Sequence, residues 1–165
     1  MGEEIKGKYI WGLLRIGIGW VFLWAFIDKV WGLGFATAAG KGWLDGVSPT
    51  FGFLKFATIG PFKQFYMSLA GNPIVDYLFM AGCLGIGLAF LFGIGMRIAC
   101  VSGALMYSFM YTAGFMPPVH NPFLDEHIIN ALLMIGLTLL NSGQWLGLGG
   151  WWANTSLVRK LPFLK

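Results

Sequence analysis

The chain has 165 residues and a mean hydropathy of +0.71, with 57% hydrophobic and only 11% charged residues. A soluble globular domain has roughly 25% charged residues, and a chain of this length has too small an interior to bury so much apolar surface. The composition therefore excludes an ordinary soluble globule and indicates a protein of the lipid bilayer. The net charge of +4 comes from lysines and arginines scattered among apolar runs, without a basic stripe or base-stacking motif, so nucleic acid is not expected as a partner.

Four apolar segments are long enough for membrane-spanning helices, which need roughly 17–25 residues. The second begins with Asn72 as N-cap and Pro73 at the first helical position, and the fourth begins in the same way with Asn121-Pro122. The sequence predicts an all-α integral membrane protein, an antiparallel bundle of four transmembrane helices in a single domain over 1–165. The helices are expected at about 9–31, 74–94, 97–115 and 122–140.

Small residues recur every four positions in the second predicted helix, at Ala81, Gly85, Ala89 and Gly93. Such a ridge lets a neighbouring helix approach closely, so we expect it to pack within the bundle.

A long loop over 32–71 joins the first two predicted helices and is too apolar to be disordered. Ser48-Pro49 and Pro61 are each typical of a helix start and are followed by aromatic residues. We therefore predict two short helices that lie on the outer membrane surface or fold over the mouth of the bundle.

An even number of spans places both termini on one side of the membrane. More lysines and arginines flank the helices on that side than on the other, so the positive-inside rule predicts a multi-pass cell-membrane protein with both termini in the cytoplasm. The outer side then carries Lys29, Lys41, Lys55 and Lys63.

The two cysteines, Cys83 and Cys100, are predicted to be free and buried. Their expected depths in the bilayer differ by well over ~10 Å at a rise of about 1.5 Å per residue, whereas a disulfide needs Cα atoms within roughly 7 Å. The sequence contains no CxxC, no zinc-ligand spacing and no nucleotide-binding glycine loop, so no metal or bound cofactor is predicted.

Polar residues at the outer helix ends are the candidates for catalysis. His127 and Asp125 lie near the start of the fourth predicted helix, and Asp28 lies near the end of the first. Histidine titrates near neutral pH and a neighbouring carboxylate can orient and charge it, so these three residues could form a proton-transfer site. The alternative, that the acidic residues only complement the dipole at the helix start, stays open.

Other polar residues could bind a substrate at this site. Asn130 follows His127 by three residues on the same helix face, while Lys29 and Lys41 could attract a small anion, although solvated loop lysines are the more common case. His120 could contribute a hydrogen bond; ligation of a metal or haem by His120 and His127 is not expected, because membrane haems usually need histidines on two facing helices. Arg15 either snorkels to the inner headgroups or makes an ion pair or anion contact inside the bundle.

A group of short stretches spread over nearly the whole chain carries a family resemblance. The most telling is the run NPFLDEHII at 121–129, and the others are residues 13–15, 22–29, 34–37, 41–44, 46–54 and 146–152. With these stretches the chain resembles the DoxX/DoxD family of small membrane proteins, and most closely the DoxD type.

The resemblance implies a membrane subunit of a thiosulfate:quinone oxidoreductase. Such an enzyme oxidises thiosulfate to tetrathionate and passes the electrons to membrane quinone, which is a substrate and not a bound cofactor. The family's archaeal enzyme has a second subunit, DoxA, so a DoxA-like partner chain is expected as well.

Two other interpretations remain open. The chain could be a non-catalytic small subunit of a respiratory membrane complex such as a terminal oxidase, whose subunits would then be its partners. It could also be a small-anion or proton transporter, with Arg15 and Asp28 lining the path.

Overall fold

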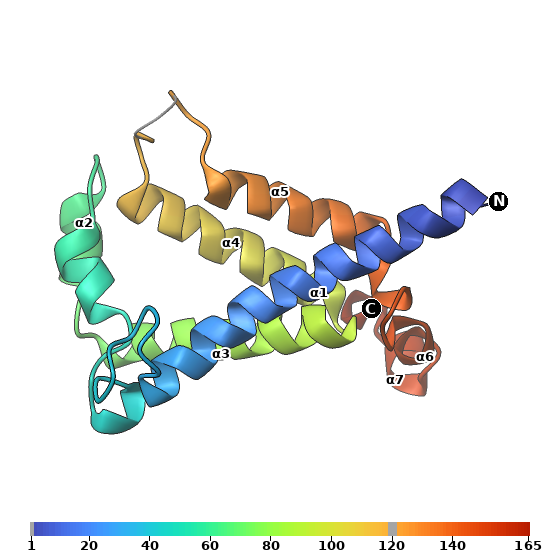
Figure 1. Ribbon diagram of the computed structural model, residues 1–165, viewed down its shortest axis with the longest axis horizontal. Helices are drawn as coiled ribbons and strands as arrows, with labels where there is room; N and C mark the ends of the chain where they lie inside the picture. The colour runs from blue at the N-terminus through green and yellow to red at the C-terminus, as the bar shows by residue number, and fades with distance from the viewer. Residues whose placement is uncertain (1, 119–121) are drawn as a thin grey trace.

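The computed structural model describes residues 2–118 and 122–165. Within these residues the secondary structure is helical and contains no strand, which confirms the predicted all-α class. The four longest helices form the body of the molecule (Figure 1). They are α1 (Gly2–Trp31), α3 (Pro73–Phe92), α4 (Met96–Gly114) and α5 (Glu126–Leu139).

Two of these helices are long and apolar enough to cross a membrane, namely Gly7–Trp31 within α1 and the whole of α3. α5 is apolar but has only 14 residues. α4 has 19 residues, but its mean hydropathy is lower than that of the two candidate spans because serine, threonine and Arg97 interrupt its apolar residues. By length and composition, the described residues therefore contain two candidate spans, where the sequence predicts four.

The four helices are arranged as two pairs. α1 packs along α3 and α4 packs along α5, and the pairs meet mainly through α3 and α4 (Figure 1). α1 and α5 touch each other little. The assembly is therefore open along the side between α1 and α5.

Two glycines allow the close packing of α1 on α3. A Cβ atom on Gly87 would lie 2.7 Å from the main-chain nitrogen of Leu23, and one on Gly19 would lie 2.6 Å from that of Leu91. Gly85 of the predicted small-residue ridge faces open space, whereas Gly93 lies close to the main chain of Gly143. The contact with α1 is made by Gly87, on the opposite side of α3 from Gly85.

Side-chain caps fix where α3 and α5 begin. The Asn72 side chain accepts a hydrogen bond from the Ile74 N–H at 2.9 Å and Pro73 is the first helical residue, as predicted. The predicted start of the fourth helix at Pro122 is wrong: α5 begins at Glu126, because the Asp125 carboxylate caps the His127 and Ile128 N–H groups. Asn121, the predicted cap, lies outside the described residues.

The long loop lies at one end of the molecule, the loop end, and the two termini lie toward the other, the terminal end (Figure 1). At the loop end, the Tyr66 hydroxyl lies 2.6 Å from that of Thr112 on α4, and Leu54, Tyr66 and Ala113 form a small second core. The loop contains a 3-10 turn at Trp43–Asp45, a π-helical turn at Phe53–Ala57 and the short helix α2 (Lys63–Ser68).

The terminal end is closed by short elements that follow α5. A 3-10 turn at Ser142–Gln144 packs against α1, α5 and the first of two short helices. These elements are α6 (Gly149–Ala153), α7 (Ser156–Lys160) and a final 3-10 turn at Pro162–Leu164.

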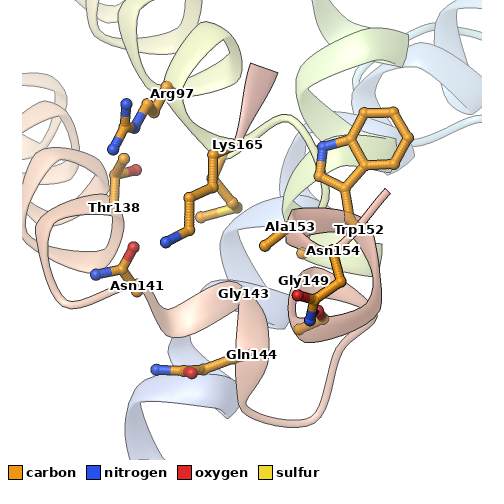
Figure 2. A pocket seen from close by; sticks show the side chains of 13 residues that line it. Arg97, Thr138, Asn141, Gly143, Gln144, Gly149, Trp152, Ala153, Asn154 and Lys165 are labelled. Carbon is orange, nitrogen blue, oxygen red and sulfur yellow. Dashed lines mark hydrogen bonds between the residues drawn. The ribbon is translucent and has the colours of Figure 1, made fainter. Parts of the chain in front are cut away.

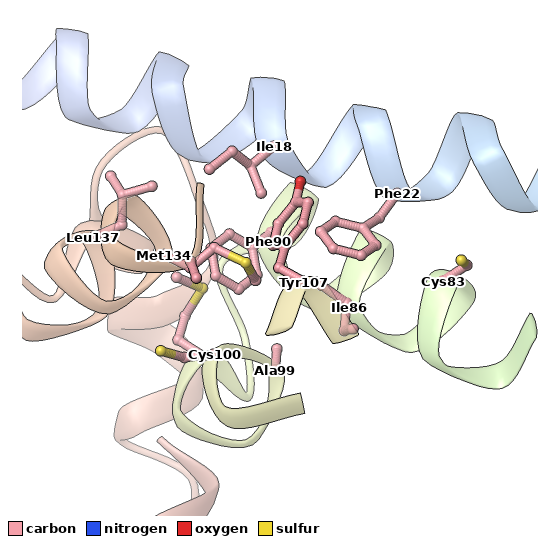
Figure 3. Packing of buried hydrophobic residues seen from close by; sticks show 12 residues of the cluster. Ile18, Phe22, Cys83, Ile86, Phe90, Ala99, Cys100, Tyr107, Met134 and Leu137 are labelled. Carbon is pink, nitrogen blue, oxygen red and sulfur yellow. The ribbon is translucent and has the colours of Figure 1, made fainter. Parts of the chain in front are cut away.

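The main hydrophobic core is built from all four long helices (Figure 3). Phe90 of α3 and Met134 and Leu137 of α5 are completely buried within it. Cys83 and Cys100 also belong to this core and are both free, as predicted.

Candidate functional site

Asp125 and His127 form a pair at the start of α5, in which His127 is buried and Asp125 is partly buried. One carboxylate oxygen of Asp125 accepts the main-chain hydrogen bonds that cap the helix, while the other lies 2.7 Å from Nδ1 of His127. His127 is only 5% exposed. The carboxylate thus fixes the orientation of the imidazole through Nδ1. Nε2 is the ring nitrogen left to exchange a proton with another group.

Aromatic rings from α4 and the residues after it enclose the imidazole. The ring centroid of Phe115 lies 4.2 Å from that of His127, and the ring of Tyr107 lies 5.8 Å away in an edge-to-face arrangement. Tyr107 in turn packs against Phe22 of α1 at 5.2 Å. These walls keep bulk water from most of the imidazole.

Asp28 is not part of this pair. It is 1% exposed, and its carboxylate accepts hydrogen bonds from the main-chain N–H groups of Thr37 at 2.8 Å and Phe35 at 3.4 Å. The end of α1 and the start of α5 lie at the same end of the molecule but well apart (Figure 1). Of the three predicted catalytic residues the structure brings two together, and Asp28 holds the turn that follows α1.

Asp76 at the start of α3 also holds a loop segment in place through its carboxylate, as Asp28 does. One of its carboxylate oxygens accepts hydrogen bonds from the hydroxyl groups of Ser48 at 2.8 Å and Thr50 at 2.5 Å. This carboxylate therefore ties the middle of the long loop to the body of the molecule.

The predicted cationic residues do not gather around His127. The Lys29 ammonium lies over the ring of Phe79 on α3, 5.8 Å from its centroid, and Lys41 is exposed in the long loop. His120 lies outside the described residues.

Arg15 lies toward the terminal end and is completely buried. Its guanidinium donates to the main-chain carbonyl groups of Phe90 and Leu91 at the end of α3, and of Trp145 and Leu146, with 2.9–3.0 Å for the last three. The guanidinium therefore neither snorkels to the surface nor lies with the predicted substrate-binding residues at the loop end. It caps carbonyl groups that the end of a helix leaves without partners.

Asn130 lies one turn beyond His127 and lines a groove of about 460 Å³ along the open side between α1 and α5. It is the one polar side chain among the described residues that line this groove. The others are Ile10, Leu13, Leu14, Gly17, Ile18, Val21 and Leu133. The groove can hold an apolar chain or ring, and Asn130 offers that molecule a hydrogen bond.

Sequence reasoning missed Tyr107 and Phe115 as neighbours of His127. Both fall within apolar stretches where an aromatic residue is typical of core packing, so no local signal distinguishes them. Within the described residues, no group of three or more His, Cys, Asp or Glu side chains is placed to hold a metal ion.

No protein-family model, curated protein or solved structure matches this chain. The resemblance to the DoxX/DoxD family therefore stays a prediction made from the sequence.

Proposed function

We propose that this chain is an integral membrane protein whose four long helices cross the bilayer with both termini in the cytoplasm. Two candidate spans and the strongly apolar composition support this placement. Helices α4 and α5 complete the arrangement, because large apolar side chains such as Phe109 and Leu132 point outward from them and would be poorly placed in water. The loop end then faces the outside of the cell.

We further propose that residues at the loop end transfer protons during the reduction of a membrane quinone. The observation that carries this proposal is the Asp125–His127 pair, 2.7 Å apart and enclosed by aromatic rings. A quinone takes up two electrons and two protons when it becomes a quinol. His127 donates a proton through Nε2, and the Asp125 carboxylate holds the imidazole in place and stabilises its charged form.

The groove between α1 and α5 supports an entry route from the lipid. It is apolar, it opens on the side where the helix pairs do not meet, and Asn130 lies one turn from His127. A quinone ring that enters here meets the amide of Asn130 as a hydrogen-bonding group.

Thiosulfate is the proposed reductant, on the strength of the DoxD resemblance. Two thiosulfate ions each lose one electron and join through a new sulfur–sulfur bond to give tetrathionate, while one quinone gains both electrons and takes two protons. Lys29 and Lys41 lie at the loop end and supply positive potential for the approaching anion. A DoxA-like partner chain completes the enzyme.

The test is thiosulfate-dependent reduction of a short-chain quinone analogue by the purified membrane complex. We expect His127→Gln to lower this rate by about a hundredfold, in the range of a lost general acid. Glu126→Gln is the matched control, because Glu126 is exposed beside the pair without belonging to it. Full activity of His127→Gln would refute the assignment of this site.

A non-catalytic subunit of a respiratory complex is the second candidate. It is favoured by one observation: Arg15, Asp28 and Asp76 all direct their polar atoms to the protein's own main chain or loop side chains. Stoichiometric co-purification with haem proteins, combined with no quinone reduction on addition of thiosulfate, would favour this alternative.

A further inference from the structure

A polar pocket of about 280 Å³ lies at the terminal end, far from the Asp125–His127 pair (Figures 1 and 2). It is bounded by the start of α4, the end of α5 with the turn that follows, and the C-terminal segment. Seven side chains that can donate hydrogen bonds line it, and no Asp or Glu is among its described lining residues. Trp152 and Asn154 donate to main-chain carbonyl groups of the protein itself. The other donors are Arg97, Thr138, Asn141, Gln144 and Lys165.

Arg97, Thr138, Asn141 and Lys165 lie around a shared space and come from α4, α5, the turn after it and the C-terminal segment (Figure 2). Figure 2 shows the Lys165 ammonium directed toward Asn141, with the Arg97 guanidinium beside Thr138. Arg97 and Lys165 therefore bring two positively charged side chains to one small cavity. Such a cavity favours an anion with several oxygen acceptors.

Much of this hydrogen-bonding capacity is unused. The Thr138 hydroxyl is buried without a partner in the described structure. The Lys165 ammonium likewise has no hydrogen-bond partner among the described residues, and Arg97 uses only one guanidinium nitrogen, donating to the Pro162 carbonyl at 3.1 Å. The remaining Arg97 nitrogens and the Lys165 ammonium can donate to a bound oxyanion.

Two hydrogen bonds hold the C-terminal segment over the pocket. The Trp152 indole N–H donates to the Leu164 carbonyl at 2.6 Å, and the Arg97 main-chain N–H donates to the Lys165 carbonyl at 3.0 Å. Lys165 is thus positioned by α4 and α6, although its side chain is exposed.

The floor of the pocket is built from close main-chain contacts. A Cβ atom on Gly93 or Gly149 would collide with the main chain of Gly143. Asn141 adopts a left-handed conformation with φ of 52°, which turns the chain directly after α5. The cavity is therefore formed before any ligand binds, which lowers the entropy cost of binding.

We infer that this pocket binds a phosphate group, and that in the cell this group is the headgroup phosphate of an anionic phospholipid. The arginine and the ammonium match phosphate oxygens in charge, and the threonine and asparagine supply neutral donors. In the proposed topology the pocket opens at the cytoplasmic interface, where anionic headgroups lie and where tryptophans such as Trp152 are common. The inference rests on the membrane placement proposed above but not on quinone chemistry.

The experiment is native mass spectrometry of the full chain in detergent, titrated with phosphatidylglycerol and, separately, with phosphatidylcholine. Inorganic phosphate is titrated in parallel as the soluble probe, with binding followed by thermal shift. The variants are the double substitution Arg97→Gln/Lys165→Gln and the single substitution Asn141→Gly, which removes the amide and keeps the left-handed turn accessible. Lys160→Gln is the matched control, because it removes a charge from the same end outside the pocket.

We expect phosphatidylglycerol to bind more tightly than phosphatidylcholine, and the double variant to weaken that binding by about tenfold or more, because it removes both cationic side chains of the pocket. Asn141→Gly weakens it by a smaller factor without loss of folding, and Lys160→Gln leaves it within twofold. Binding of inorganic phosphate without a preference for phosphatidylglycerol would support the phosphate pocket and assign it to a soluble ligand.

The inference is overturned if the double variant and the wild type bind both probes equally, or if Lys160→Gln weakens binding as much as the double variant does. Quinone reduction by the same variants is expected to be unchanged, because the pocket and the Asp125–His127 pair lie at opposite ends. Loss of lipid binding and loss of catalysis therefore report on different proposals.

Discussion

The guanidinium of Arg15 on α1 donates a 2.9 Å hydrogen bond to the carbonyl oxygen of Leu91, which follows it by 76 residues. The same side chain also reaches Trp145 and Leu146 beyond α5. One buried cation therefore joins the first helix, the end of α3 and the C-terminal segment. It contributes to the fold by satisfying carbonyl groups that face the protein interior and not water.

Replacement of Arg15 should lower stability without a specific effect on catalysis. We expect Arg15→Gln to reduce the free energy of unfolding by about 3 kcal/mol or more, because several charge-assisted hydrogen bonds are lost together. Arg15→Lys should lose less, since it keeps the charge but not the planar set of donors. Thermal unfolding in detergent measures both, and Arg97→Gln at an exposed position is the control. Equal stability of Arg15→Gln and the wild type would contradict this account.

Asp125→Asn separates the two roles of Asp125. Asparagine caps a helix about as well as aspartate, so we expect the stability of α5 to change by less than about 0.5 kcal/mol. Quinone reduction should nevertheless fall by about tenfold or more, because a neutral amide cannot stabilise a protonated His127 in the same way. Circular dichroism and the reduction assay measure the two effects. Asp125→Ala, which also removes the cap, should lose about 1 kcal/mol in addition. Full quinone reduction by Asp125→Asn would mean that the residue acts only as a cap.

Asp28→Asn should act on the loop and not on the proton-transfer site. An amide replaces one acceptor oxygen by a donor, so one of the hydrogen bonds to Thr37 and Phe35 is lost, at a cost of about 1–3 kcal/mol. Hydrogen exchange should then become faster at the Thr37 amide, while the rate of quinone reduction by the folded protein stays near that of the wild type. A rate as low as that of His127→Gln, with Thr37 still protected, would return Asp28 to the catalytic group.

Two glycines on α3 provide a matched pair of substitutions. Gly87→Ala should destabilise the protein strongly, because its Cβ would lie within 3 Å of three Leu23 atoms on α1, two of them main-chain. Gly85→Ala should be neutral or stabilising by up to about 1 kcal/mol, because open space surrounds it and alanine favours a helix. Unfolding in detergent compares the two. If both variants lose the same stability, the packing of α1 on α3 differs from that described here.

Local chemistry explains which features were predictable. The start of α3 depends on Asn72 and Pro73 alone, and the cap extends only to Ile74, so adjacent residues were enough to predict it. The start of α5 was not predictable in this way, because Asn121-Pro122 and Asp125 are competing start signals a few residues apart. Asp125 caps the helix in the structure, where its second oxygen also holds the buried His127.

By itself, the sequence determined the helical class, the apolar character that points to the bilayer, the free cysteines and the nearness of Asp125 to His127, because all of these depend on composition or on residues close together in the chain. Only the tertiary structure decided the partners of Arg15 and Asp28, the use of Gly87 instead of Gly85, and the aromatic walls around His127. Helical periodicity tells which residues share a face of one helix. It does not tell which other element that face meets, and that depends on the packing of the whole chain.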